Sequence, residues 1–338
     1  MKKQKNTNKT VFFKKIFIKI CRLIGYEIID QSRYEVPTLE KNLNNSLSIP
    51  GKKSITVPLG EFKITRKIKS LNVIFRSSTA ELIMDQGKKR LFEKQKNEYT
   101  FRSLNSLLKS VEKAQNIYKK INYEITIFDT RSSKNDIETM KKILSNFNIS
   151  NKIIEINLND FKNKIAGGYS DGKFANLASL YSSLISARDN SDDLIYFVED
   201  DYIHTKECIT EMLFSYEKFS SLFNKEIFLL PADYPYLYTN NNSTKIFLGN
   251  EKHWQLVEES LLTFMTSRTI ILDNFDKLLE MVTNWNEPFE KPLHIIYKKT
   301  PCFSPIPSLS IHCSNINSVY GLPPHLDWKM IWDENEDY

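Results

Sequence analysis

Three consecutive acidic residues follow directly after an apolar run of the sequence. Residues 194–198 are all large and apolar, and Glu199, Asp200 and Asp201 come next. Such a run predicts a strand that is buried on both faces. Because an unpaired buried carboxylate is strongly destabilising, three of them at the end of a core strand require a cation or an open cleft. Ligands bind at the carboxyl ends of strands in open α/β sheets, so we expect a binding site here.

The donor atoms indicate the kind of ligand. Carboxylate oxygens with no cysteine close by favour a hard divalent cation, Mg²⁺ or Mn²⁺, which in turn would hold a phosphate-bearing substrate. The alternative is a solvated acidic turn in front of a helix that begins near Thr205. The elements around the motif favour the metal site.

Strand and helix signals alternate along most of the chain. Apolar runs predict strands, and apolar residues at helical spacing predict helices. The strands are expected at 71–75, 123–128, 152–158, 194–198, 227–231 and 261–265, and the helices at 101–121, 136–147, 174–187, 209–219 and 269–282. This order predicts an α/β fold with a doubly wound, mostly parallel central sheet and helices on both faces.

The chain divides into four parts on these signals. They are a basic amphipathic helix (1–30), a linker with short strands (31–68), a main domain (69–325, with halves 69–202 and 203–325) and an acidic tail (326–338). We expect the tail to be loose and solvated, because it is short, charged and terminal.

The N-terminal segment concentrates positive charge. Its first 22 residues hold eight Lys and Arg residues and no acid, so the net charge of +6 becomes slightly negative over the remainder. That balance argues against a nucleic-acid groove on the fold. Apolar residues recur at helical spacing between the cations, namely Phe13, Ile16, Phe17, Ile20, Leu23 and Ile24. We expect a helix that lies on an anionic membrane surface or packs on protein, and its cations prevent it from spanning a bilayer.

The four cysteines form no CxxC pair and no zinc spacing. Free thiols are typical of a reducing compartment. We therefore expect a cytoplasmic protein that is peripheral on the inner membrane face, because the N-terminal segment also lacks the clean apolar centre of a signal peptide.

One glycine-rich stretch matches the spacing of a phosphate loop. The motif GxxxxGK runs from Gly167 to Lys173, but Phe174 stands where a hydroxyl should reach Mg²⁺, and no strand leads directly into the loop. GxGxxG does not occur in the sequence. These observations argue against an ATPase-type loop and a dinucleotide fold, although a helix N-terminus here could still attract an anion.

The order of polar residues at strand ends resembles a known family. A strand ending in Arg76, a strand ending in Asp129 and a strand ending in Glu199–Asp200–Asp201 follow one another. This order is similar to that of GT-A fold glycosyltransferases, especially family 2-like members of bacterial surface-polysaccharide clusters. The acidic triplet would be a version of their DxD motif, and the resemblance covers residues 71–312.

The resemblance implies a nucleotide-sugar donor across the ends of the first strands. Asp129 would contact the nucleoside, and Arg76 would lie near the base or phosphates. The implied donor contacts are Arg76, Asp129, Arg131, Lys173, Asn176 and Asp200, and the implied metal ligands are Glu199, Asp201 and the late histidine His312. His204 competes with His312, and Asp200 could hold either ribose or metal.

An inverting sugar transfer also needs a general base for the acceptor hydroxyl. In the family this base lies downstream of DxD, near the start of a later helix, and the matching segment here is 283–290. We choose Glu287, with Asp233 and Glu259 as rivals. The Trp and Tyr residues of 234–254 could stack on sugars, but aromatic residues in strands are more often part of the core.

Three functions remain compatible with the sequence. The first is metal-dependent transfer of a sugar from a nucleotide-sugar donor to a glycan or lipid-linked acceptor. The second is nucleotidyl transfer, although residues 77–80 offer no glycine for the loop that this reaction requires. The third is a catalytically silent protein that binds sugar or a partner at the membrane.

Overall fold

The computed structural model describes residues 8–26, 28, 53–56, 60–80, 89–167, 169–239, 243–284 and 288–338. In chain order the elements are α1 Asn8–Leu23, β1 Lys53–Thr56, β2 Gly60–Lys63, β3 Ser70–Ser77, η2 Leu91–Glu93, α2 Lys96–Ile117, β4 Asn122–Asp129, α3 Lys134–Ser145, β5 Ser150–Glu155, η3 Leu158–Phe161, α4 Asp171–Asn190, β6 Leu194–Glu199, β7 Tyr202–His204, α5 Cys208–Phe223, β8 Phe228–Leu229, η4 Pro235–Tyr238, β9 Ile246–Leu248, β10 His253–Val257, β11 Phe264–Ser267, α6 Arg268–Asp273, α7 Phe275–Thr283, α8 Lys291–Tyr297, β12 Cys302–Ile306, β13 Ser310–His312 and α9 Trp328–Asp333.

Within these ranges the strands form a main sheet in the order β5-β4-β3-β6-β11-β8-β12-β10-β9. The first four strands are parallel to one another. In the remaining strands most neighbours are antiparallel, beginning with β11 against β6, and only β12 and β8 are parallel. The predicted α/β fold is confirmed, and its parallel part coincides with residues 70–199.

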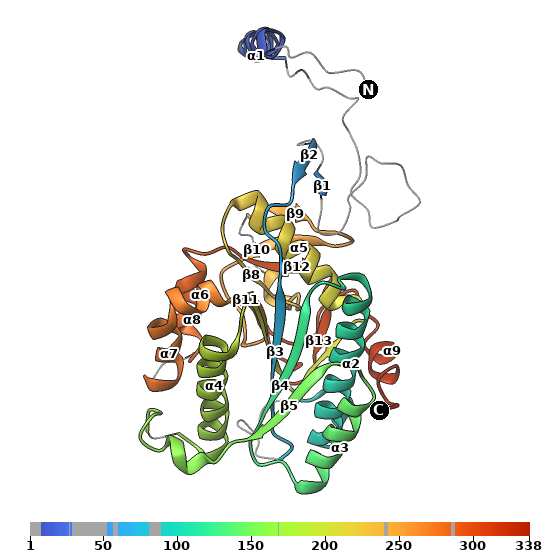
Figure 1. Cartoon of the computed structure of the whole chain (residues 1–338), viewed down its shortest axis with the longest axis vertical. Helices are drawn as coiled ribbons and strands as arrows, with labels where there is room; N and C mark the ends of the chain where they lie inside the picture. Colours follow the sequence, from blue (N-terminus) through green and yellow to red (C-terminus); the bar gives the residue numbers. More distant parts are fainter. Residues whose placement is uncertain are drawn as a thin grey trace.

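The parallel strands have apolar sequences because helices cover both of their faces. Figure 1 shows α2 and α3 on one side of these strands and α4 on the other. The five residues 194–198 of β6 are almost fully buried, as is most of β3. Crossovers through helices bring the carboxyl ends of β3, β4 and β6 to one edge of the sheet, where the polar residues follow.

The second half of the sheet is built mainly from antiparallel neighbours. β9 and β10 form a hairpin, and β10 then pairs with β12. Trp254 of β10 and Tyr234 are fully buried, so these two aromatic residues belong to the core. The strand expected at 261–265 begins only at Phe264, and the helix expected at 269–282 is broken at Asn274 into α6 and α7.

A second small sheet places residues from the two halves together. β13 pairs with β7 in antiparallel register, so His312 lies opposite Tyr202. The backbone N–H of Cys313 donates to the carbonyl oxygen of Asp201 at 2.8 Å. This pairing brings a residue near the C-terminus beside the acidic triplet, although more than a hundred residues separate them.

The C-terminal segment does not match the expected solvated tail. Residues 328–333 form α9, and Trp332 is buried. The guanidinium of Arg102 lies 4.4 Å from the centre of the Trp332 ring and donates from Nη1 to its carbonyl oxygen at 2.8 Å. The prediction of a loose tail was wrong, because a few aromatic contacts and backbone hydrogen bonds outweigh its charge.

Candidate functional site

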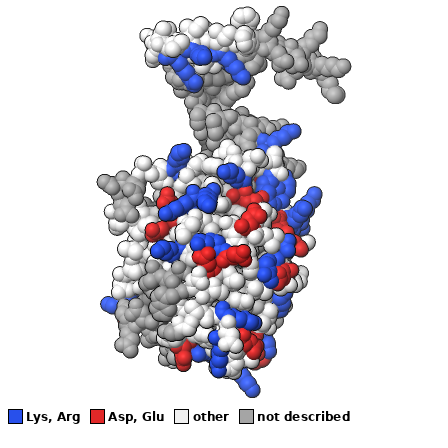
Figure 2. Space-filling view, turned by 90° about the vertical axis from the view of Figure 1, so that its left-hand side faces the viewer, with Lys and Arg blue, Asp and Glu red and all other residues white. Residues whose placement is uncertain are grey.

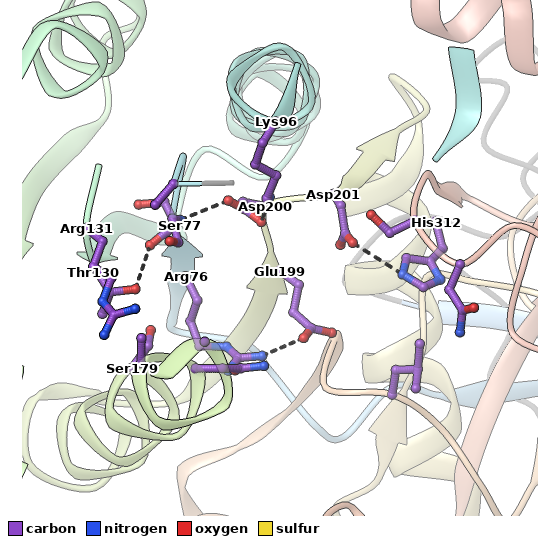
Figure 3. A pocket seen from close by; sticks show the side chains of 18 of the residues that line it. Arg76, Ser77, Lys96, Thr130, Arg131, Ser179, Glu199, Asp200, Asp201 and His312 are labelled. Carbon is purple, nitrogen blue, oxygen red and sulfur yellow. Dashed lines mark hydrogen bonds and ion pairs between the residues drawn. The ribbon is translucent and has the colours of Figure 1, made fainter. Parts of the chain in front are cut away.

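A cavity of about 330 Å³ lies at the carboxyl edge of the parallel strands. Residues from the ends of β3, β4 and β6 form its floor, and α2, α4 and the segment around His312 form its walls. Figure 3 shows the side chains of Arg76, Glu199, Asp201 and His312 in this region. The acidic triplet therefore faces an open space, as the sequence predicted.

Arg76 and Glu199 form a buried ion pair across neighbouring strands. They occupy partner positions of β3 and β6, and Arg76 Nη2 donates to Glu199 Oε1 at 2.8 Å. Arg76 Nη1 donates to Asn176 Oδ1 of α4, also at 2.8 Å. Burial raises the pKa of Glu199, although the positive charge of Arg76 opposes the rise. Arg76 Nε is buried and has no hydrogen-bond partner among the described residues.

Asp200 has its acceptor positions filled by the protein. Its Oδ2 accepts from the backbone N–H of Ser78 at 2.9 Å and from Thr100 Oγ1 at 2.8 Å, and its Oδ1 pairs with Lys96 Nζ. Lys96 and Thr100 stand in the first two turns of α2. Asp200 thus ties the N-terminus of α2 to the end of β3 (Figure 3).

Asp201 and His312 form a second pair that faces the cavity. The distance from Asp201 Oδ2 to His312 Nε2 is 3.4 Å. On the other side of the ring, His312 Nδ1 lies 2.8 Å from the carbonyl oxygen of Tyr320. A carbonyl only accepts, so Nδ1 carries a proton and Nε2 is the nitrogen directed at Asp201. The ring also stacks on Tyr202, with 4.8 Å between the ring centres.

The pKa values of this pair move apart. Burial alone would raise the pKa of Asp201, but the charge and hydrogen bond of His312 outweigh burial and hold that pKa below its usual value. Burial alone would lower the pKa of His312, but Asp201 raises it above the usual value for histidine. The pair therefore holds a proton between Asp201 Oδ2 and His312 Nε2, two atoms of the kind that bind metal ions.

Asp129 lies behind the cavity wall. It is buried and accepts hydrogen bonds from Ser77 Oγ at 2.7 Å and from Ser132 Oγ at 2.5 Å. Burial raises its pKa, and the nearby Asp200 contributes to the rise. The residues that follow it, Thr130 and Arg131, line the cavity instead.

Arg131 adopts a backbone conformation that is uncommon for a residue with a side chain. Its φ is 66°, in the left-handed region, and Asn315 on the opposite wall has a φ of 55°. Such conformations are frequent at functional sites, where the surrounding structure compensates for the strain. Arg131 has no ion pair with an acidic residue in the described parts of the chain.

Several of the other predicted residues lie elsewhere. Asp233 is fully buried, accepts from Tyr238 and Gln255, and does not line the cavity. The ammonium of Lys173 lies over the ring of Tyr169, at 4.7 Å from its centre, and outside the lining. Glu287 lies outside the described residues.

His204 and Glu259 also lie apart from the acids. His204 is buried and hydrogen-bonded to the hydroxyl of Tyr196 at 2.7 Å. Glu259 accepts from the hydroxyl of Tyr320 at 3.0 Å and is not part of the lining. Of the two histidines that the sequence offered, only His312 therefore reaches Asp201.

Sequence reasoning missed three charged lining residues. Glu290 is a buried acid at the start of α8, and it ends the segment 283–290 that the sequence singled out. Lys96 and Arg90 also line the cavity. No local signal marks these two cations, because their positions depend on how α2 packs.

The residues fit a divalent cation held by two protein ligands. No group of three His, Cys, Asp or Glu side chains in the described parts of the chain is arranged to hold a metal. Glu199 is directed at Arg76, which leaves Asp201 and His312 as the donors. The carbonyl of Tyr320 orients His312 in the way that outer-shell partners orient histidine ligands. Mg²⁺ and Mn²⁺ commonly take one or two protein ligands and complete their shell with phosphate and water.

Comparisons with known proteins give only distant likenesses. No family model and no curated protein matches the sequence. Among solved structures, S. aureus TarS 1–349 in complex with UDP is 15% identical with a TM-score of 0.38; the match covers 70% of this chain and 57% of that one. The galactosyltransferase LgtC, solved with donor and acceptor sugar analogues, is 8% identical with a TM-score of 0.32; the match covers 69% of this chain and 72% of that one.

Structures of a different activity are similar to the same degree. The inositol-1-phosphate CTP transferase from T. maritima is 8% identical with a TM-score of 0.39, and the match covers 80% of this chain and 97% of that one. This chain therefore spans little more than half of TarS 1–349 and nearly the whole of the CTP transferase. Likenesses this distant do not assign an activity, so the site itself must support one.

Proposed function

We propose that this chain is a glycosyltransferase that moves a sugar from a nucleotide-sugar donor to a hydroxyl group of a glycan or lipid-linked acceptor. The observation that carries the proposal is one cavity that is lined by cations, by the Asp201–His312 pair and by a further buried acid, Glu290 at the start of α8. Sugar transfer needs both features, because a diphosphate must leave and a hydroxyl must lose its proton.

The cations would bind the donor diphosphate. Arg76 and Arg131 both line the cavity. Planar guanidinium groups match the geometry of phosphate oxygens and keep their charge at any physiological pH. Buried and preorganised, these groups would stabilise the negative charge that grows on the diphosphate as its bond to the sugar breaks.

Asp201 and His312 would hold Mn²⁺ or Mg²⁺. When bound, the cation would neutralise the diphosphate as a Lewis acid. Asp201 contributes a carboxylate whose lowered pKa keeps it ionised, and His312 contributes Nε2 in an orientation fixed by Tyr320. Binding of a cation would displace the proton that the pair otherwise shares, so metal affinity should fall at low pH.

Glu290 would act as general base. The acceptor oxygen attacks the anomeric carbon, its proton passes to the Glu290 carboxylate, and the bond from that carbon to the diphosphate oxygen breaks, which releases the nucleoside diphosphate. An attack opposite the leaving group inverts the configuration of the sugar. Glu290 is preferred to Asp233, because Glu290 lines the cavity and Asp233 does not. Glu287 stays a prediction.

The test combines ligand binding with product analysis. A ligand at a hundredfold excess over its Kd raises apparent stability by about 2.7 kcal/mol, so a thermal-shift panel of nucleotide sugars with and without Mn²⁺ should identify the donor. Asp201→Asn should lose the Mn²⁺-dependent part of the shift. The matched control is Asp192→Asn, an exposed acid just before the other end of the same strand, which should behave as wild type.

Three results would contradict the proposal. Absence of stabilisation by every nucleotide sugar would favour a silent binding protein. An undiminished Mn²⁺-dependent shift in Asp201→Asn would remove its metal role. Release of pyrophosphate from a nucleoside triphosphate and a sugar phosphate would assign the site to nucleotidyl transfer instead.

A further inference from the structure

The N-terminal helix α1 exposes its large apolar side chains. Phe13 and Leu23 are 68% and 80% exposed, and Phe17 and Ile20 are also more than half exposed. In the rest of the described chain, apolar residues of this size are mostly buried in the core around the main sheet. A cluster of exposed phenylalanine, isoleucine and leucine on one helix marks a surface that binds something apolar.

Between residues 12 and 24, most large apolar residues lie on one side of α1 and the cations lie on the other. At 100° per residue, residues 12, 13, 16, 17, 20, 23 and 24 fall on one arc, and Lys14, Lys15, Lys19 and Arg22 fall on the remainder together with Ile18. Figure 2 shows the blue side chains of α1 along one side of the helix and white atoms along the other. The helix carries no acidic residue.

We propose that α1 binds the surface of an anionic lipid bilayer, with its apolar arc in the acyl boundary and its cations among the headgroups. The positive charge of α1 favours an anionic bilayer over another protein as its binding partner. A groove on another protein would have to match both an apolar strip and a dense row of cations, whereas an anionic leaflet offers both along its whole surface.

The dimensions of α1 favour a position in the plane of the membrane. Its 16 residues give a length of about 24 Å, shorter than the roughly 30 Å hydrocarbon core of a bilayer. Across the described residues, no helix is long and apolar enough to span a membrane. A helix of this type lies within the headgroup region.

The rest of the protein is less suited than α1 to bind an anionic membrane. In Figure 2 the acidic and basic residues of the body alternate over the visible face, whereas α1 carries cations only. Attraction to an anionic surface, which falls off within about 10 Å at 0.1 M salt, would therefore act mainly through α1. The proposal does not depend on the sugar-transfer function.

The experiment is sedimentation of the full chain with lipid vesicles. Vesicles of phosphatidylcholine with about one third phosphatidylglycerol should carry the protein down at low salt, and pure phosphatidylcholine should bind much less of it. Each cation near an anionic surface contributes about fivefold to binding, so Lys15→Gln/Lys19→Gln should weaken it roughly thirtyfold. Phe13→Ser/Phe17→Ser should weaken it by roughly tenfold or more.

The matched control is Lys141→Gln/Lys142→Gln on α3, which removes two exposed lysines from the body. This variant should bind within about twofold of the wild type. All four side chains changed on α1 are exposed, so the variants should keep the circular dichroism and melting temperature of the body.

The outcomes separate the possible occupants. Failure of the wild type to bind anionic vesicles, or equal binding by the α1 variants, would overturn the proposal. Equal binding to pure phosphatidylcholine would also overturn it, because the cations would then have no role. Vesicle-independent dimers that Phe13→Ser/Phe17→Ser dissociates would assign the apolar arc to a second copy of the chain.

Discussion

Acidic residues beside the two halves of the sheet differ in their partners. Beside the antiparallel half, Glu211 of α5 is buried and accepts from the backbone N–H groups of Asn250 and Glu251 at 3.0 and 2.9 Å and from Trp254 Nε1 at 3.1 Å. In the parallel half, Asp201 faces a cavity, and its partner is the side chain of His312. Both acids are shielded from bulk water, yet only Asp201 can exchange its partner for a ligand.

The difference separates structural acids from functional acids. Neutral backbone donors are fixed by the fold, so an acid that they satisfy has a stabilising role and no spare acceptor. A cationic side chain at the edge of a cavity is less fixed, and a phosphate or a metal ion can replace it. Asp200 lies between the two classes. It lines the cavity, but a backbone N–H, a hydroxyl and Lys96 already occupy the acceptor positions of its oxygens.

The largest effect is expected for Glu290→Gln. The amide keeps the size of the side chain but cannot accept the acceptor proton, so kcat should fall about 10³-fold while the melting temperature changes little. The loss of kcat is measured from the rate of sugar transfer to the acceptor, with release of the nucleoside diphosphate as the readout. Glu258→Gln, an exposed acid outside the cavity, is the matched control and should keep wild-type activity.

The same assay on Glu287→Gln decides between the two bases of this segment. If Glu287→Gln lost activity and Glu290→Gln kept it, the base would be Glu287, as the sequence first predicted. If both variants were fully active, no acid of segment 283–290 would be the base, and the assignment of the cavity would fail.

The second prediction concerns the pH dependence that Asp233 contributes. Burial raises its pKa from 3.8 to about 6, although hydrogen bonds from Tyr238 and Gln255 oppose the rise. The folded state therefore binds the proton more tightly than the unfolded state does. Its stabilising contribution is complete below pH 3.8 and is lost as the pH rises through about 6, by roughly 3 kcal/mol.

Asp233→Asn removes this titration. The difference in unfolding free energy between variant and wild type should move by about 2.4 kcal/mol in favour of the variant between pH 4 and pH 7. Urea unfolding at both pH values measures it, and kcat should stay near wild type because Asp233 lies outside the cavity. A loss of kcat at unchanged stability would place Asp233 among the functional acids.

The third prediction tests Glu211, the acid with backbone donors. Glu211→Gln replaces one acceptor oxygen with a donor and leaves one of the surrounding N–H groups unsatisfied, at a cost of about 2 kcal/mol in unfolding free energy. Gly249 packs so closely that a Cβ atom there would lie 2.3 Å from Glu211 Oε1, so the loop has little room to adjust. Chemical denaturation measures the cost, and an unchanged stability would remove the distinction between the two classes.

The sequence predicted the parallel half of this molecule well because each signal there is local. Apolar runs such as 194–198 are buried on both faces, and the polar residue that ends each strand falls at one edge of the sheet. Arg76, Glu199 and Asp201 could therefore be placed together from the order of elements alone. His312 could be predicted as a site residue only from the resemblance to a family, because it reaches the acidic triplet only through the pairing of β13 with β7.

The remaining features depend on tertiary packing. Lys96 reaches Asp200 because α2 crosses the sheet at one position, which no spacing in the sequence encodes. The tail 326–338 is terminal and acidic, yet Trp332 packs on Tyr99 and Arg102, which both belong to α2. Glu287 and Glu290 are three residues apart in the sequence, so a sequence pattern alone cannot decide which of them acts as the base.

The smallest effect is expected for Arg131→Gln. Among the described residues Arg131 has no acidic partner, so its charge is available for phosphate, and the fold loses little when that charge is removed. One charged hydrogen bond to phosphate is worth about 1.5 kcal/mol, so the Kd for the nucleotide-sugar donor should rise roughly tenfold at unchanged melting temperature. Arg188→Gln changes a partly exposed arginine that is paired with Asp189 outside the cavity; this control should bind the donor as wild type does. Calorimetric titration of the donor gives both constants. If the two variants bound the donor with equal Kd values, the prediction that Arg131 binds phosphate would be wrong. The absence of an acidic partner would then not distinguish a functional cation from a surface cation.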